Sequence, residues 1–168
     1  SAGAGGELIV HQYGLGNLTI DSDNSGPSSL TITGPSTTNP AEFNTTGVVT
    51  LVGTNIFTGK TVVKGAVRSS ANEASLGAVP ASSFPDQLTL NGGTLRFTGN
   101  NESMSQNRGV TIGGNGGVIE ITNPNGNLFL ENTITSLGAV TSGTGGATTN
   151  GSVTVTVAST TGLATGMI

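Results

Sequence analysis

The sequence predicts an all-β protein whose short parallel strands stack as a β-solenoid, and three observations support this prediction. Alternating apolar and polar runs, rich in Val, Leu, Ile and Thr, recur between Gly, Asn, Ser and Pro residues. Their starts at Leu8, Leu30 and Val49, and again at Leu88 and Val110, are spaced by about 19 to 22 residues, as in stacked coils too small to bury an apolar face alone. Apolar spacings of three and four are rare, so no helix is predicted.

The clearest repeat lies between Leu88 and Thr122, where a strand, a glycine turn and a second strand occur twice. LTLNGGTLRFTG is followed by a linker of ten residues and then by VTIGGNGGVIEIT, with equivalent positions 22 to 24 residues apart. The paired turn glycines are Gly92, Gly93, Gly116 and Gly117. An antiparallel β-sandwich is the alternative fold, because a turn such as Asn91-Gly92-Gly93 can close a hairpin as well as a coil corner.

The remaining predicted strands are short and alternate in the same way. They cover residues 7–13, 17–21, 29–33, 48–52, 61–67, 127–135 and 152–158. The predicted organisation is a β-solenoid over residues 1–137, a linker or loop over 138–151 that is almost free of large side chains, and a C-terminal segment over 152–168. In that segment Val153, Val155 and Val157 alternate with polar residues and are candidates for a cap, a strand that pairs with another molecule, or the start of a further domain.

Composition excludes several classes of function. Charged residues make up 8% of the 168 residues and aromatic residues 4%, but 33% are hydrophobic, which favours folding over disorder. A net charge of −4 with five Lys and Arg residues gives no basic surface for nucleic acid or anionic lipid. The chain has no Cys for disulfides or thiolate sites. It has no apolar run long enough to span a bilayer. Its start at Ser1 suggests a processed chain or a piece of a longer protein.

The segment GTNIFTGKT superficially matches a phosphate-binding loop. Five residues separate Gly53 from Gly59, where that loop has four, and no helix is predicted to follow. We therefore interpret the segment as a coil corner in which Gly53, Asn55 and Gly59 turn the chain, Phe57 packs inward and Lys60 is solvated.

Acidic residues offer only weak candidates for chemistry. Asp21 and Asp23 follow a strand and share a face, so they are a weak calcium candidate, with two solvated carboxylates as the alternative. The single His11 excludes a multi-histidine metal site. Glu120 and Glu131 are the pair expected on neighbouring coils, and a polysaccharide-degrading enzyme would need such a cluster. We expect no catalytic residue and no cofactor.

Residues 47–122 resemble the autotransporter-associated β-strand repeat, also called the passenger-associated transport repeat. The resemblance lies in the order and spacing of a Thr/Leu strand, a G-x-N-x-F-T-G-x-T segment, a short apolar strand, a small-residue Leu-Gly pair and LTLNGGTL. The matching residues are Val49, Thr50, Leu51, Gly53, Asn55, Phe57, Thr58, Gly59, Thr61, Val62, Val63, Leu76, Gly77 and Leu88 to Leu95. Two departures, Gly65-Ala66-Val67 and the insertion Pro35 to Thr46, change loop lengths.

The resemblance implies a right-handed parallel β-helix of a secreted or surface-displayed bacterial protein, and it supplies no catalytic residues. We therefore expect a non-enzymatic rod, spacer or filament subunit that associates with itself or with adjoining domains of a longer chain. The alternative is an adhesin or carbohydrate-binding module that contacts surface glycans. Its binding loops would be Pro35 to Asn44 and Ala71 to Asp86, and its recognition-like side chains Tyr13, Phe43 and Phe84.

Overall fold

The computed structural model describes residues 5–34, 47–65, 68–70 and 72–136. The described strands are β1 (Glu7–His11), β2 (Leu18–Ile20), β3 (Ser29–Thr33), β4 (Val48–Leu51), β5 (Thr61–Lys64), β6 (Arg68–Ser70), β7 (Phe84–Asn91), β8 (Thr94–Phe97), β9 (Asn101–Met104), β10 (Arg108–Ile112), β11 (Val118–Ile121), β12 (Asn127–Leu130) and β13 (Ile134–Ser136). The helical part of the described chain is η2, a 3₁₀ turn of four residues at Glu73–Leu76. No described helix has the length and apolar character needed to cross a bilayer.

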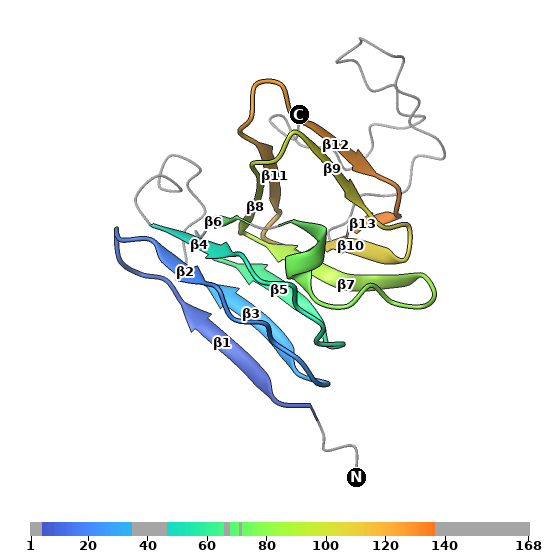
Figure 1. The fold of residues 1–168 in the computed structure, drawn as a ribbon, viewed down its shortest axis with the longest axis horizontal. Coiled ribbons are helices and arrows are strands. Elements are labelled where there is room, and N and C mark those ends of the chain that lie inside the picture. The colour runs from blue at the N-terminus through green and yellow to red at the C-terminus, as the bar shows by residue number, and fades with distance from the viewer. Residues whose placement is uncertain (1–4, 35–46, 66–67, 71, 137–168) are drawn as a thin grey trace.

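The strands form three parallel sheets that run along the molecule (Figure 1). The first sheet has the order β1-β3-β5-β7-β10-β13, the second β11-β8-β6-β4-β2, and the third pairs β12 with β9. Each coil contributes one strand to the first sheet and then one to the second. The coils that begin at β7 and β10 also add one strand each to the third sheet before the next coil begins. Every strand pairing within these sheets is parallel. The fold is therefore a β-solenoid, as predicted, and the antiparallel sandwich is wrong.

The doublet predicted from LTLNGGTL and VTIGGNGG forms two adjacent coils. Leu88 of β7 lies opposite Val110 of β10, and β8 pairs with β11 in the same order. Between the strands, Gly92 and Gly116 have φ values of +89° and +75°, a region that glycine occupies without steric cost. The Gly92 amide donates to the Gly116 carbonyl at 2.7 Å, so the two corners lie one above the other.

The predicted coil length of about 19 to 24 residues is confirmed between Leu8 and Leu30, which pair, but it is wrong for the two coils that follow. Leu30 pairs with Thr61 rather than repeating at Val49, which belongs to the second sheet. Thr61 in turn pairs with Leu88. These coils are longer because additional residues separate their strands. Parallel stacking fixes only the paired positions within the strands, so coils of different lengths can stack on one another.

Three predicted segments differ from the observed strands. The strand predicted over residues 61–67 ends at Lys64 as β5, because Gly65 turns the chain with a φ of +74°, and β6 starts only at Arg68. Residues 127–135 divide between β12 and β13. The linker of ten residues contains β9, which ends at the fully buried Met104 and pairs with β12 to make the third sheet.

The core is a column of side chains that point into the coils, most of them from strands, with Phe57 and Leu76 coming from the segments between strands. Removing such side chains from water contributes about 1.5–3 kcal/mol each. The buried apolar residues are Val10, Leu30, Ile32, Val49, Leu51, Phe57, Val63, Leu76, Leu88, Leu90, Leu95, Phe97, Met104 and Val110.

Candidate functional site

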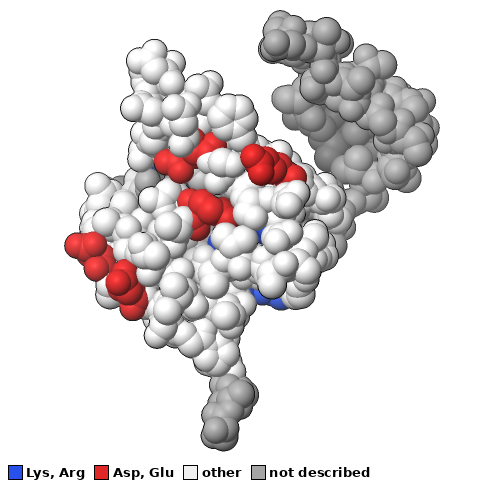
Figure 2. Space-filling model, turned by 45° about the vertical axis from the view of Figure 1, so that its right-hand side comes forward, with Lys and Arg blue, Asp and Glu red and all other residues white. Residues whose placement is uncertain are grey.

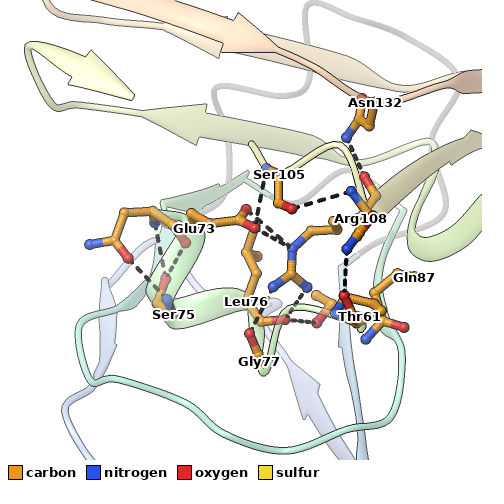
Figure 3. Close-up of polar contacts among 12 residues, drawn as sticks. Thr61, Glu73, Ser75, Leu76, Gly77, Gln87, Ser105, Arg108 and Asn132 are labelled. Carbon is orange, nitrogen blue, oxygen red and sulfur yellow. Dashed lines mark hydrogen bonds and ion pairs between the residues drawn. The ribbon is translucent and has the colours of Figure 1, made fainter. Parts of the chain in front are cut away.

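A buried arginine ties the segment that contains η2 to the stacked coils (Figure 3). Arg108, at the start of β10, is 0% exposed. Its Nε lies 3.1 Å from both carboxylate oxygens of Glu73, and its Nη1 and Nη2 donate to the carbonyls of Leu76 and Gly77 at 2.8 and 2.7 Å. One side chain therefore contacts both ends of the helical turn.

These contacts satisfy backbone groups that a short helix leaves without partners. At the first end of η2, Asn72 and Ser75 form a capping box, each side chain accepting from the backbone N–H of the other. At the second end, the Leu76 carbonyl accepts from Arg108 and also from Thr61 Oγ1 at 3.2 Å. A cation at a helix C-terminus is also favourable in the field of the aligned peptide dipoles.

The next feature along the chain is an irregularity at the start of β7. Arg108 lies opposite Phe84, but Val110 lies opposite Leu88, so β7 holds extra residues between two aligned positions. Such a bulge bends a strand and redirects its side chains. Phe84 stays 44% exposed as a result. Gly109 permits the close approach, since a Cβ at that position would lie 2.4 Å from the Pro85 Cα.

The bulge and the segment after η2 enclose an open cleft of about 480 Å³. Its size is within the range of small-molecule sites, about 300–1,000 Å³. The cleft combines apolar residues from the segment after η2 with polar residues from the coil below. Its lining residues are Ser29, Thr58, Gly59, Lys60, Ala78, Val79, Pro80, Ala81, Phe84 and Gln87.

An ion pair stands at one side of this cleft. Lys60 Nζ contacts Asp86 Oδ2 and also lies 5.5 Å from the centroid of the Phe84 ring, within the range of a cation–π contact. The interpretation of Lys60 as a solvated residue is therefore only half right, because its side chain is partly exposed but has both an anionic and an aromatic partner.

The proposed corner residues hold successive coils together. Asn55 is 3% exposed, and its Oδ1 accepts from the backbone N–H of Asn24 at 2.8 Å while its Nδ2 donates to the Ser75 carbonyl at 2.7 Å. Gly59 lies against the coil below, since a Cβ there would be 2.3 Å from the Ser28 carbonyl oxygen. Gly53 packs close to the backbone of Ser22 in the same way. The segment is followed by β5, not by a helix.

Replacing Asn55 with alanine is expected to lower the free energy of unfolding by about 2–3 kcal/mol, because the buried groups that it satisfies lose their partners. Urea denaturation measures this difference, and Asn125→Ala, at an exposed position of a turn, serves as the control. Equal stability of the two variants would contradict a role for Asn55 in joining coils.

The carboxylates predicted as site candidates do not converge. Glu120 pairs with Arg96 at 2.8 Å, whereas Glu131 accepts from Ser103 Oγ at 3.3 Å. The expectation that these glutamates lie on neighbouring coils is wrong, because Glu120 is in β11 and Glu131 follows β12 of the same coil. Acidic side chains form separate patches on the face shown in Figure 2.

The calcium candidate stays a prediction. Asp21 and Asp23 are exposed beyond the end of β2. Among the described residues, no three His, Cys, Asp or Glu side chains are grouped closely enough to hold a metal ion. The assembly candidates Val153, Val155 and Val157, and the insertion over residues 35–46, lie outside the described residues.

Sequence analysis missed the Arg108 cluster and the β7 bulge. The available signal was the Asn72-Glu-Ala-Ser75 capping pattern followed by Leu76-Gly77, which predicts a helical turn that needs a C-terminal partner. Nothing in the local sequence indicates that this partner is an arginine 31 or 32 residues further along the chain.

Comparison with known proteins finds one informative similarity. The chain is 34% identical over 141 residues to the adhesin BmaC autotransporter of Brucella suis biovar 1 (strain 1330). The match covers 79% of this chain and 4% of that adhesin, so the chain corresponds to a small part of its length. No family model matches the chain, so the specific repeat family stays a prediction, and no solved structure matches it.

Proposed function

We propose that this chain is a structural, non-enzymatic β-solenoid unit of a secreted or surface-exposed bacterial protein, acting as a rod, spacer or filament subunit. The similarity to part of an autotransporter adhesin supports a passenger-like unit at the cell surface. The parallel stacking supports a mechanical role, because each coil adds a row of backbone hydrogen bonds and a layer of core to the previous one.

The observation that carries this proposal is the open edge at each end of the described solenoid. Among the described strands, β1 and β2 at one end, and β11, β12 and β13 at the other, have a hydrogen-bonded neighbour on one side only. Apolar side chains on these terminal strands are exposed, among them Leu8, Ile9, Ile121 and Ile134. Unpaired edges favour the addition of another strand, which would extend the rod through adjoining coils or a second molecule.

Removing residues 138–168 is expected to abolish end-to-end association, because the alternating segment with Val153, Val155 and Val157 would supply the added strand. Sedimentation velocity of the complete and shortened chains over a range of concentrations measures the association. Equal association of both chains would contradict a role for the C-terminal segment, and a monomeric complete chain would leave only the spacer role.

An adhesin or carbohydrate-binding module is the second candidate, and the cleft beside Phe84 favours it. This cleft is bordered by the described part of the predicted binding loop Ala71 to Asp86, whereas Tyr13 is exposed just after β1 and Phe43 lies outside the described residues. A glycan array probed with the complete chain distinguishes this candidate from the spacer, which predicts no specific binding.

A further inference from the structure

We infer that the cleft between Val79 and Phe84 is a binding site for a neutral saccharide, one sugar ring of which stacks on the apolar wall while its hydroxyl groups reach Lys60 and the polar residues beside it. The inference rests on the second candidate function and specifies the location and class of its ligand.

The cleft has two walls, the first formed by Val79, Pro80 and Ala81 and the second by Phe84, and residues of the next coil hold both. Arg108 binds the carbonyls of Leu76 and Gly77 just before the first wall, and Asn107 Nδ2 donates to the Pro80 carbonyl at 3.0 Å. The carbonyl of the same Asn107 accepts from the backbone N–H of Phe84 at 2.9 Å. The two walls are thus joined by one residue, and a site formed before its ligand arrives loses little conformational entropy on binding.

The floor of the cleft is equally well defined. Gln87 is buried, and its Nε2 donates to the Gly59 carbonyl at 2.7 Å, which joins the end of the bulge to the coil below. The Lys60 backbone N–H donates to Ser29 Oγ at 3.2 Å. These contacts leave the side chains of Val79 and Phe84 exposed on a supported surface.

The distribution of groups matches the two faces of a sugar. A pyranose ring presents C–H groups on one face and hydroxyl groups at its rim, so it packs on an apolar or aromatic surface and bonds to polar groups at the edge. Val79, Pro80, Ala81 and Phe84 supply the apolar surface of this cleft. Lys60 stands beside that surface as a donor, and the hydroxyl groups of Ser29 and Thr58 in the same lining can donate or accept.

Charge favours a ligand without net charge. Lys60 is the one charged residue among those that line the cleft, and its charge is balanced by Asp86, which contacts Lys60 from outside the lining. A charged ligand would have to displace one member of this pair and leave the other without its partner. A neutral saccharide can accept a hydrogen bond from Lys60 without separating the pair.

Titration of the complete chain with methyl glycosides of glucose, galactose and N-acetylglucosamine, and with cellobiose and maltose, tests the inference. At least one is expected to shift the amide NMR signals of Thr58, Gly59, Val79 and Ala81 at millimolar concentration. Phe84→Ala should weaken this binding by about tenfold or more, equivalent to about 1.4 kcal/mol. Phe84→Tyr should retain it, and Phe129→Ala, at another exposed phenylalanine, should leave it unchanged.

Circular dichroism melting of each variant separates loss of binding from loss of fold. If Phe84→Ala unfolds, Val79→Ser, which changes the exposed residue of the opposite wall, should give the same loss of binding. The inference is overturned if no neutral saccharide shifts the cleft signals, if only sialic acid or a proline-rich peptide does so, or if Phe84→Ala and Val79→Ser both bind normally.

The outcome also separates this inference from the function on which it rests. Glycan-array binding by the complete chain without shifts in the cleft keeps the adhesin candidate and removes the cleft as its site. Absence of both overturns both, while the proposed end-to-end association is judged independently by sedimentation.

Discussion

Replacing Arg108 with alanine is expected to lower the free energy of unfolding by about 3–5 kcal/mol, the range found when one partner of a buried ion pair is removed. The variant would leave the Glu73 carboxylate and the carbonyls of Leu76 and Gly77 without their cationic donor, and it would also open a cavity. Urea denaturation of the complete chain, followed by circular dichroism, measures the change.

Arg96→Ala is the matched control for this experiment. Arg96 also pairs with a glutamate, Glu120, but both side chains of that pair are partly exposed, and no backbone carbonyl is recorded as a partner of Arg96 among the described residues. Its loss is expected to cost at most about 1 kcal/mol. Similar costs for the two arginines would show that burial and the carbonyl contacts of Arg108 add nothing to stability.

Replacing Phe97 with alanine is expected to lower the free energy of unfolding by about 3–5 kcal/mol, as for large aromatic side chains in other cores. Phe97 is 1% exposed in β8, and the column of side chains around it is fixed by the register of the sheets. Neighbouring coils therefore have little freedom to collapse into the cavity. The same denaturation experiment measures the effect.

Phe129→Ala provides the control at a second phenylalanine in a strand. Phe129 is 56% exposed in β12, so its removal takes little apolar surface from the core and should change stability by less than about 1 kcal/mol. A loss at Phe129 that equals the loss at Phe97 would mean that the face of β12 assigned to solvent is covered in solution.

Much of the fold follows from local patterns. In LTLNGGTL and VTIGGNGG, alternation selects the inward residues Leu88, Leu90 and Val110, and equal spacing predicts that Leu88 and Val110 lie one above the other, as they do. The prediction succeeds because successive side chains of a strand point to opposite faces, and because stacked strands must keep matching registers. The same argument failed between Leu30 and Val49, since an insertion changes the spacing without changing the pattern of either strand.

The cleft and the buried cluster were much less predictable. The sequence indicates Phe84 as a recognition-like residue and the loop from Ala71 to Asp86 as a binding loop, but neither the bulge nor the ion pair of Lys60 with Asp86 has a local signal. β9 was missed because NESM does not show the apolar alternation of the other strands. Its strand conformation comes from pairing with β12 in the next coil.

The sequence by itself determined the class of fold, the inward-facing residues of the repeated strands and the glycine turns between Leu88 and Thr122, because these depend on neighbours within a few positions. The tertiary structure alone decided which strands pair across the insertions, that Arg108 is buried against η2, and that Phe84 borders a cleft. Each of these depends on residues brought together from different coils, and the energy of such contacts is decided by burial and geometry that no local pattern encodes.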